Sequence, residues 1–193
     1  MIAVYVVAGV VGLLLIAFGV SYDRFVRQRN TIKASWSNVD TELRRRYDLI
    51  PNLVNTVKGY AAHEKEIFEK VAEARQAAIA QAGPPDAQAK TENQLVSGLR
   101  QLFAVVENYP QLKASQNFLA LQTELSNTED RIQAARRFYN NNVRAYNTRV
   151  QAFPSNVVAG MFKFTAEQYF EIDEAIRTAG APQVDLAPET GTP

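Results

Sequence analysis

The N-terminal stretch Met1–Tyr22 contains no charged side chain, and Ile2–Val20 is almost entirely aliphatic. As a helix that rises about 1.5 Å per residue, this stretch is roughly 30 Å long, which is enough to cross the hydrocarbon core of a bilayer. We therefore expect residues 1–22 to form a transmembrane anchor that contacts the lipid bilayer through residues 2–22.

A cleaved signal peptide is the alternative interpretation of this run. It would need a basic residue before the apolar run and a small-x-small cleavage site after it. The chain has no Lys or Arg before the run and continues with Ser21–Phe25, through which the helical pattern passes without a break. We therefore favour a retained anchor.

The cations next to the anchor predict its orientation. They all lie on its C-terminal side, at Arg24, Arg27, Arg29 and Lys33. By the positive-inside rule, the rest of the chain is then cytoplasmic and the short N-terminus is outside. The opposite orientation is the alternative.

Apolar residues recur every three or four positions after Phe25, which is typical of helices and not of strands. Pro and Gly residues interrupt the pattern and separate the predicted helices. The predicted units cover residues 25–80, 87–109, 112–153 and 157–176. We predict an all-α fold, in which residues 23–176 form an elongated antiparallel bundle of long helices. The tail, residues 177–193, is rich in Pro, Gly and Ala and is predicted to be disordered.

Composition argues against several classes of function. The 21 basic and 20 acidic side chains give a net charge of +1, whereas a dedicated nucleic-acid-binding protein would show a strong basic excess. The chain has no cysteine, which excludes disulfides, thiol catalysis and thiolate metal sites. We expect no nucleic-acid partner.

Metal and catalytic motifs are incomplete in this sequence. His63-Glu64 would need a second His at position 67 to match a zinc protease, and that position is Ile67. A carboxylate-bridged di-iron bundle would need two Glu-x-x-His motifs, and the chain has 1 His. Nucleophile-elbow, P-loop and dinucleotide motifs are absent. We expect no enzyme activity, no metal, no cofactor and no small-molecule substrate.

The stretch Arg44–Val54 combines three arginines, an acid and a proline. Asp48 is placed to cap a new helix with Pro51 in its first turn, and a proline kink is the alternative. We interpret the stretch as a junction between a membrane-proximal stalk and the helical body.

The arginines Arg44, Arg45 and Arg46 have two interpretations. In the first, they pair with acids on neighbouring helices or face water. In the second, they bind lipid phosphates or an acidic partner through the planar fork of arginine. The run lies about 33 Å beyond Tyr22 along a continuous helix, which argues against direct lipid contact.

A second unusual patch lies in the predicted unit 112–153. It contains Arg136, Tyr139, Asn140, Tyr146 and Asn147. The two Tyr are seven positions apart, as are the two Asn, so each pair repeats on one helical face. Such residues form either a structural polar layer, which fixes register by hydrogen bonds, or a recognition surface for a partner helix.

These and other runs carry a resemblance to a known family. They include residues 34–40 (ASWSNVD), 43–54 (LRRRYDLIPNLV), 57–61 (VKGYA), 107–114 (ENYPQLKA), 117–118, 121–125 (LQTEL), 128–132 (TEDRI), 136–140 (RRFYN), 146–148 (YNT) and 153–154. In this order they resemble the LemA family over roughly residues 1–172. The resemblance implies a bacterial protein with one N-terminal membrane helix and a helical body, and it transfers no catalytic residue or cofactor.

Two functional hypotheses follow for a protein of this kind. The first is a non-enzymatic scaffold at the bacterial inner membrane, with its body on the cytoplasmic side, which organises membranes or partner proteins and associates with itself. It rests on the single anchor, the long helices and the lack of catalytic motifs. The alternative is an adaptor or regulator of a membrane protease or envelope-stress system.

Overall fold

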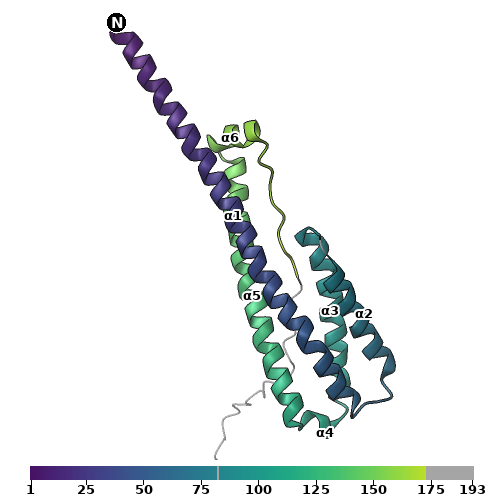
Figure 1. Ribbon diagram of the computed structural model, residues 1–193. Helices are drawn as coiled ribbons and strands as arrows, with labels where there is room; N and C mark the ends of the chain where they lie inside the picture. Colours follow the sequence, from purple (N-terminus) through teal and green to yellow (C-terminus); the bar gives the residue numbers. More distant parts are fainter. Residues whose placement is uncertain (82, 173–193) are drawn as a thin grey trace, which may run out of the picture.

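The computed structural model describes residues 1–81 and 83–172, and these contain helices but no strand (Figure 1). The helices are α1 (Ile2–Lys58), α2 (Lys65–Ala80), α3 (Pro85–Val106), α4 (Pro110–Lys113), α5 (Gln116–Gln151) and α6 (Ser155–Phe162). The prediction of an all-α fold of long helices is confirmed. The predicted disordered tail, residues 177–193, lies outside the described residues.

The longest helices, α1 and α5, pack side by side in antiparallel orientation (Figure 1). Buried side chains of α1 recur at intervals of seven, at Phe25, Ile32, Val39, Arg46 and Leu53. Those of α5 do the same, at Phe118, Leu125, Ile132, Tyr139 and Tyr146. A seven-residue period keeps one seam facing the partner helix, as in a coiled coil. This seam is the main core of the molecule.

Helices α2 and α3 form a second antiparallel pair beside the C-terminal half of α1 (Figure 1). Leu95, Leu99 and Leu102 of α3 are fully buried. Gly98 faces α2, where an added Cβ would lie 3.4 Å from Cγ2 of Val71. The pair widens the bundle at the end that lies far from the N-terminus.

The first helical unit does not run to Ala80, so this prediction is wrong. Helix α1 ends at Lys58, and the chain reverses through residues 59–64 before α2 begins. The amides of Tyr60 and Ala61 both donate to the carbonyl of Val57, which closes the last turn. Apolar periodicity missed this end because buried residues on both sides, Val57, Ala61 and Phe68, continue the same spacing.

The predicted junction at Asp48 is also wrong, because α1 continues through Pro51. A proline in a helix interior leaves the carbonyl four residues earlier without its amide donor. Here that carbonyl belongs to Tyr47, and the Arg75 Nε–H from α2 donates to it at 2.7 Å. The helix therefore keeps this carbonyl paired without a break, and Asp48 is exposed on its surface.

The prediction of a last helix over residues 157–176 is wrong for residues 163–172, and its residues 173–176 lie outside the described residues. Helix α6 ends at Phe162, because Lys163 adopts a left-handed conformation (φ 56°). The Lys163 and Phe164 amides close the helix end on the carbonyls of Gly160 and Ala159. Residues 164–172 then run back along the bundle without regular structure (Figure 1). We call residues 164–172 the return segment.

Candidate functional site

A buried ion cluster joins α1, α3 and α5. It consists of Arg46, Tyr47, Gln88, Glu92 and Glu129, all of which are buried. The Arg46 guanidinium donates to both carboxylate oxygens of Glu129, at 3.0 and 3.2 Å, and to Glu92. Glu92 also accepts hydrogen bonds from the Tyr47 hydroxyl and from the Gln88 amide. The cluster therefore fixes the position of three helices relative to one another.

The electrostatics of the cluster keep its donors protonated. Burial opposes the charge of Arg46, but the carboxylates of Glu129 and Glu92 outweigh burial and raise the guanidinium pKa above its usual value. Burial, and then the charge of Glu92, also raise the pKa of the Tyr47 phenol well above its usual value. Arg46 thus stays a cation and Tyr47 stays a hydrogen-bond donor.

The other members of the predicted Arg44–Val54 stretch lie outside the cluster. On the surface of α1, Arg44 pairs with Asp40 at 2.9 Å and Arg45 pairs with Glu42 at 3.4 Å. Asp48 and Pro51 are exposed. The structure thus places one of the three arginines in the core and two in water. The run contained no signal for this difference, apart from the period of seven that Arg46 shares with Val39 and Leu53.

A second constellation, which we call the amide clamp, consists of Asn140 and Asn147 on α5. The Asn147 amide group donates to the Glu167 carbonyl at 2.9 Å and accepts from the Glu167 N–H at 2.8 Å. Asn140 makes the same pair of bonds with Phe170, at 3.0 and 2.9 Å. Each asparagine therefore satisfies both backbone groups of one residue in the return segment.

The spacing of the clamp matches the geometry of both partners. Seven residues of helix rise about 10.5 Å. Three residues of an extended chain, as from Glu167 to Phe170, span about 10 Å. The two asparagines are thus in register with the return segment, and they recognise its backbone without selecting its side chains.

Tyr139 and Arg136 of the predicted patch also contact the return segment. The Tyr139 hydroxyl donates to the Gln168 carbonyl at 2.8 Å, and Arg136 donates to the carbonyl of Ile172. Burial, and then the charge of Glu167, raise the pKa of Tyr139 to about 12. Burial also raises the pKa of Tyr146, whose ring packs edge-on against Phe25.

Aromatic residues that the sequence analysis did not select complete this site. The Phe170 ring is fully buried and packs edge-on against Trp36, with ring centroids 5.1 Å apart. Phe164 stacks on Phe25 at 4.8 Å. Trp36 is the one tryptophan of the chain, and the sequence analysis predicted no contact for it.

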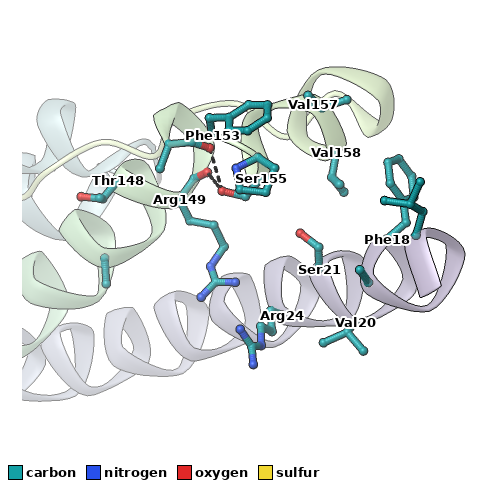
Figure 2. A pocket seen from close by; sticks show the side chains of 15 residues that line it. Phe18, Val20, Ser21, Arg24, Thr148, Arg149, Phe153, Ser155, Val157 and Val158 are labelled. Atoms are coloured by element: carbon teal, nitrogen blue, oxygen red, sulfur yellow. Dashed lines mark hydrogen bonds between the residues drawn. The ribbon is translucent and has the colours of Figure 1, made fainter. Parts of the chain in front are cut away.

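A pocket of about 780 Å³ opens near the end of the apolar part of α1. Its walls come from α1, from the last turns of α5 and from the start of α6 (Figure 2). Most of the lining is apolar, and Arg24 and Arg149 supply two cations. The sequence analysis noted Arg24 as a flanking cation but did not predict a pocket.

His63, for which the sequence analysis found no complete metal motif, is exposed in the turn between α1 and α2. Within residues 1–81 and 83–172, no three His, Cys, Asp or Glu residues converge as metal ligands would.

The N-terminal part of α1 is long and apolar enough to cross a membrane, and none of that window is buried. The same helix continues into the core of the bundle. Together these features define a class, the all-helical proteins with one candidate membrane helix.

Within this class, the LemA family profile matches residues 35–186. The chain belongs to the LemA family, as the sequence resemblance predicted.

Three relatives illustrate this membership. Magnetosome protein MamQ 2 of Paramagnetospirillum magneticum is 27% identical, over 78% of this chain and 64% of its own length. Magnetosome protein MamQ of Magnetospirillum gryphiswaldense is 26% identical, over 77% and 64%. Protein LemA of Metamycoplasma hominis is 26% identical, over 80% and 71%. The chain thus spans less than two thirds of the length of these MamQ proteins.

Proposed function

We propose that this protein is a non-enzymatic, membrane-anchored helical scaffold that organises membranes or partner proteins by associating with itself. The observation that carries this proposal is the continuity of α1 (Ile2–Lys58). Its first part exposes apolar side chains, whereas its second part forms the bundle core with α5. Anchor and body therefore share one uninterrupted helix, which suits a protein that positions other molecules.

The relatives support an assembly role in a general way. Two of them are named magnetosome proteins, and a scaffold role for this chain agrees with a place in such a cellular structure. The buried carboxylates that α3 and α5 contribute to the core belong to the ion cluster, where they hold the helices together.

Self-association is tested on the full chain in detergent and in vesicles. We expect light scattering after size exclusion to show an oligomer, and electron microscopy to show altered vesicle shape. The matched control is residues 1–22 fused to an unrelated soluble domain, which should change neither. A strict monomer that leaves the vesicles unchanged would contradict the scaffold role.

Crosslinking in intact cells separates the scaffold from the adaptor. A scaffold gives crosslinks between copies of this chain, identified by mass spectrometry. A stoichiometric complex with a membrane protease, without crosslinks between copies, would replace the scaffold by the adaptor.

We also propose a single-pass arrangement at the inner membrane with the body in the cytoplasm. Four cations follow the apolar run, at Arg24, Arg27, Arg29 and Lys33, which favours this orientation. The chain has no cysteine, so single cysteines can be introduced in a short polar extension before Met1 and at the exposed Ser97. A membrane-impermeant maleimide added to spheroplasts should label the first and not the second, and the reverse result would invert the orientation.

A further inference from the structure

The pocket between α1, α5 and α6 begins within the apolar run that the anchor places in lipid. Leu14, Phe18 and Val20 of α1 line it together with Val157 of α6 and with Phe153, which precedes α6 (Figure 2). The pocket is therefore continuous with the membrane-facing surface of α1, and the protein fills neither its mouth nor its apolar wall.

Apolar side chains around the pocket are unusually exposed. Phe153 is 83% exposed, Leu14 64% and Val157 50%. Helix α6 also exposes Met161. Contiguous apolar surface of this kind marks a site that lipid or another molecule covers. Since α6 packs on Phe18 and Tyr22 through Phe162, it lies at the level where the uncharged run ends.

The other end of the pocket is cationic. Figure 2 shows the guanidinium groups of Arg24 and Arg149 at one end, away from Phe18 and Val158. Neither arginine forms an ion pair within the described part of the chain. The Nε of Arg149 is buried and lacks a hydrogen-bond partner there. Arg149 also lies over the Phe25 ring at 5.9 Å, which holds its position.

We propose that this pocket binds one anionic phospholipid from the leaflet that faces the body. The lipid phosphate lies between Arg24 and Arg149, and one acyl chain lies along the apolar wall from Leu14 to Phe18 and Val157. Helix α6 rests in the headgroup region beside it. The inference rests on the membrane-anchored part of the proposed function.

Four arguments favour this occupant. Arginine presents a planar set of donors that matches phosphate oxygens. Basic pockets beside membrane helices are suited to lipid headgroups of negative charge. A zwitterionic lipid carries a positive group next to its phosphate, which two neighbouring guanidinium groups disfavour. The arginines also lie on the side of the body and the apolar wall on the side of the apolar run, which matches the order of headgroup and acyl chain in a phospholipid of this leaflet.

The test uses native mass spectrometry of the full chain, released from detergent with phosphatidylglycerol or phosphatidylcholine added. We expect one phosphatidylglycerol to be retained at least tenfold more tightly than phosphatidylcholine. The double variant Arg24→Gln/Arg149→Gln should lose this preference. The control Arg27→Gln/Arg144→Gln changes the same net charge on the same two helices and should keep it. Glycerol 1-phosphate, which has no acyl chain, should compete poorly.

A second variant tests the apolar wall. Ala17→Trp fills the pocket from the exposed side of α1 without changing charge, and it should lower the retention of both lipids. Circular dichroism checks that each variant folds. Equal losses in the two double variants, or no preference in the unmodified chain, would overturn the proposal.

Two further readouts separate this inference from the proposed function. If alkaline extraction releases the chain from membranes, the anchor itself fails. If the chain stays in the membrane and self-associates but shows no lipid preference, only the lipid site fails. Crosslinks from Phe153 or Val157 to the anchor of a second copy would assign the pocket to a protein helix and overturn the lipid site.

Discussion

Arg46 carries its charge in a core shared by three helices, whereas its neighbours Arg44 and Arg45 carry theirs in water. Two buried carboxylates, Glu92 and Glu129, depend on this one guanidinium. Removing one partner of a buried ion pair leaves an uncompensated charge in a medium of low polarity, which costs far more than loss of a surface pair.

Arg46→Met should therefore lower the free energy of unfolding by about 3–5 kcal/mol. Arg44→Gln and Arg45→Gln are matched controls in the same run and should leave it nearly unchanged. Urea unfolding of the detergent-solubilised chain, followed by circular dichroism, measures the difference. The pair Arg46→Met/Glu129→Leu should recover part of the loss, because it removes one unpaired carboxylate. Equal effects at all three arginines would contradict the cluster.

The amide clamp predicts a local effect at Asn140 and Asn147. Replacing either by Leu removes two hydrogen bonds and should destabilise the return segment by about 1–3 kcal/mol. Hydrogen exchange should become faster at the Glu167 and Phe170 amides and stay unchanged in the α1 core. Asn141→Leu is the control, because Asn141 is exposed. Unchanged protection in both clamp variants would show that aromatic packing alone holds the segment.

Tyr139 predicts a loss of stability in alkali. Its phenol ionises near pH 10.0 in the unfolded chain and near 12 in the folded one. Below pH 10 both states keep the proton, so this stabilisation is fully present; above it the unfolded state loses the proton first, and stability falls. Tyr139→Phe should lower the melting temperature at pH 8, through the lost bond to Gln168, but should flatten the decline between pH 10 and 12. An unchanged decline would contradict the assignment.

At the scale of elements, apolar periodicity was enough to predict helices and their buried faces. It could not predict where α1 ends, because Val57 and Ala61 continue one spacing across the turn at residues 59–64. It also could not predict the return segment, whose conformation depends on the amide clamp far away in sequence. The repeat of Asn140 and Asn147 was visible, but its partner was the backbone of Glu167 and Phe170, and backbone groups leave no sequence pattern.

Helix α1 tolerates Pro51 because a different element supplies the missing donor. The Tyr47 carbonyl would otherwise be unpaired beside a largely buried side chain, and Arg75 of α2 donates to it. Sequence rules treat such a proline as a helix end. Here it frees a carbonyl of α1, to which the neighbouring helix α2 donates a hydrogen bond.

A double-mutant cycle tests this role of Arg75. Arg75→Met should cost about 1–3 kcal/mol in the natural chain, because the Tyr47 carbonyl loses its partner. In the Pro51→Ala background the new backbone amide at position 51 can donate to that carbonyl, so the same change should cost clearly less. The coupling free energy from four unfolding curves measures the difference. Simple additivity would show that Arg75 stabilises the bundle in another way.

At the scale of the whole molecule, the apolar N-terminal part of α1 and the bundle share one helix but little packing. None of the apolar window of α1 is buried, Phe18 near its end packs partly buried against the core, and the seam with α5 begins at Phe25. Folding of the body and insertion of the anchor are therefore separable, even though no linker lies between them.

Deletion of residues 2–16 should leave the body folded. This change keeps Phe18 and Tyr22, which contact Phe162, and we expect the free energy of unfolding to change by less than about 0.5 kcal/mol. Alkaline extraction should release the shortened chain from membranes. The full chain under the same conditions is the control. A large loss of helix signal by circular dichroism would show that the body depends on its anchor.

The unbroken course of α1 gives the molecule the mechanics of a lever. From Tyr22 to Lys58 the helix extends about 54 Å, so in the proposed membrane arrangement a change of about 10° in the tilt of α1 moves the far end by about 9 Å. Bilayer thickness is one factor that changes the tilt of a membrane helix. The α2–α3 pair at the distant end would then move by about the width of a helix. A change in bilayer thickness would thus displace a part of the protein that lies far from the membrane.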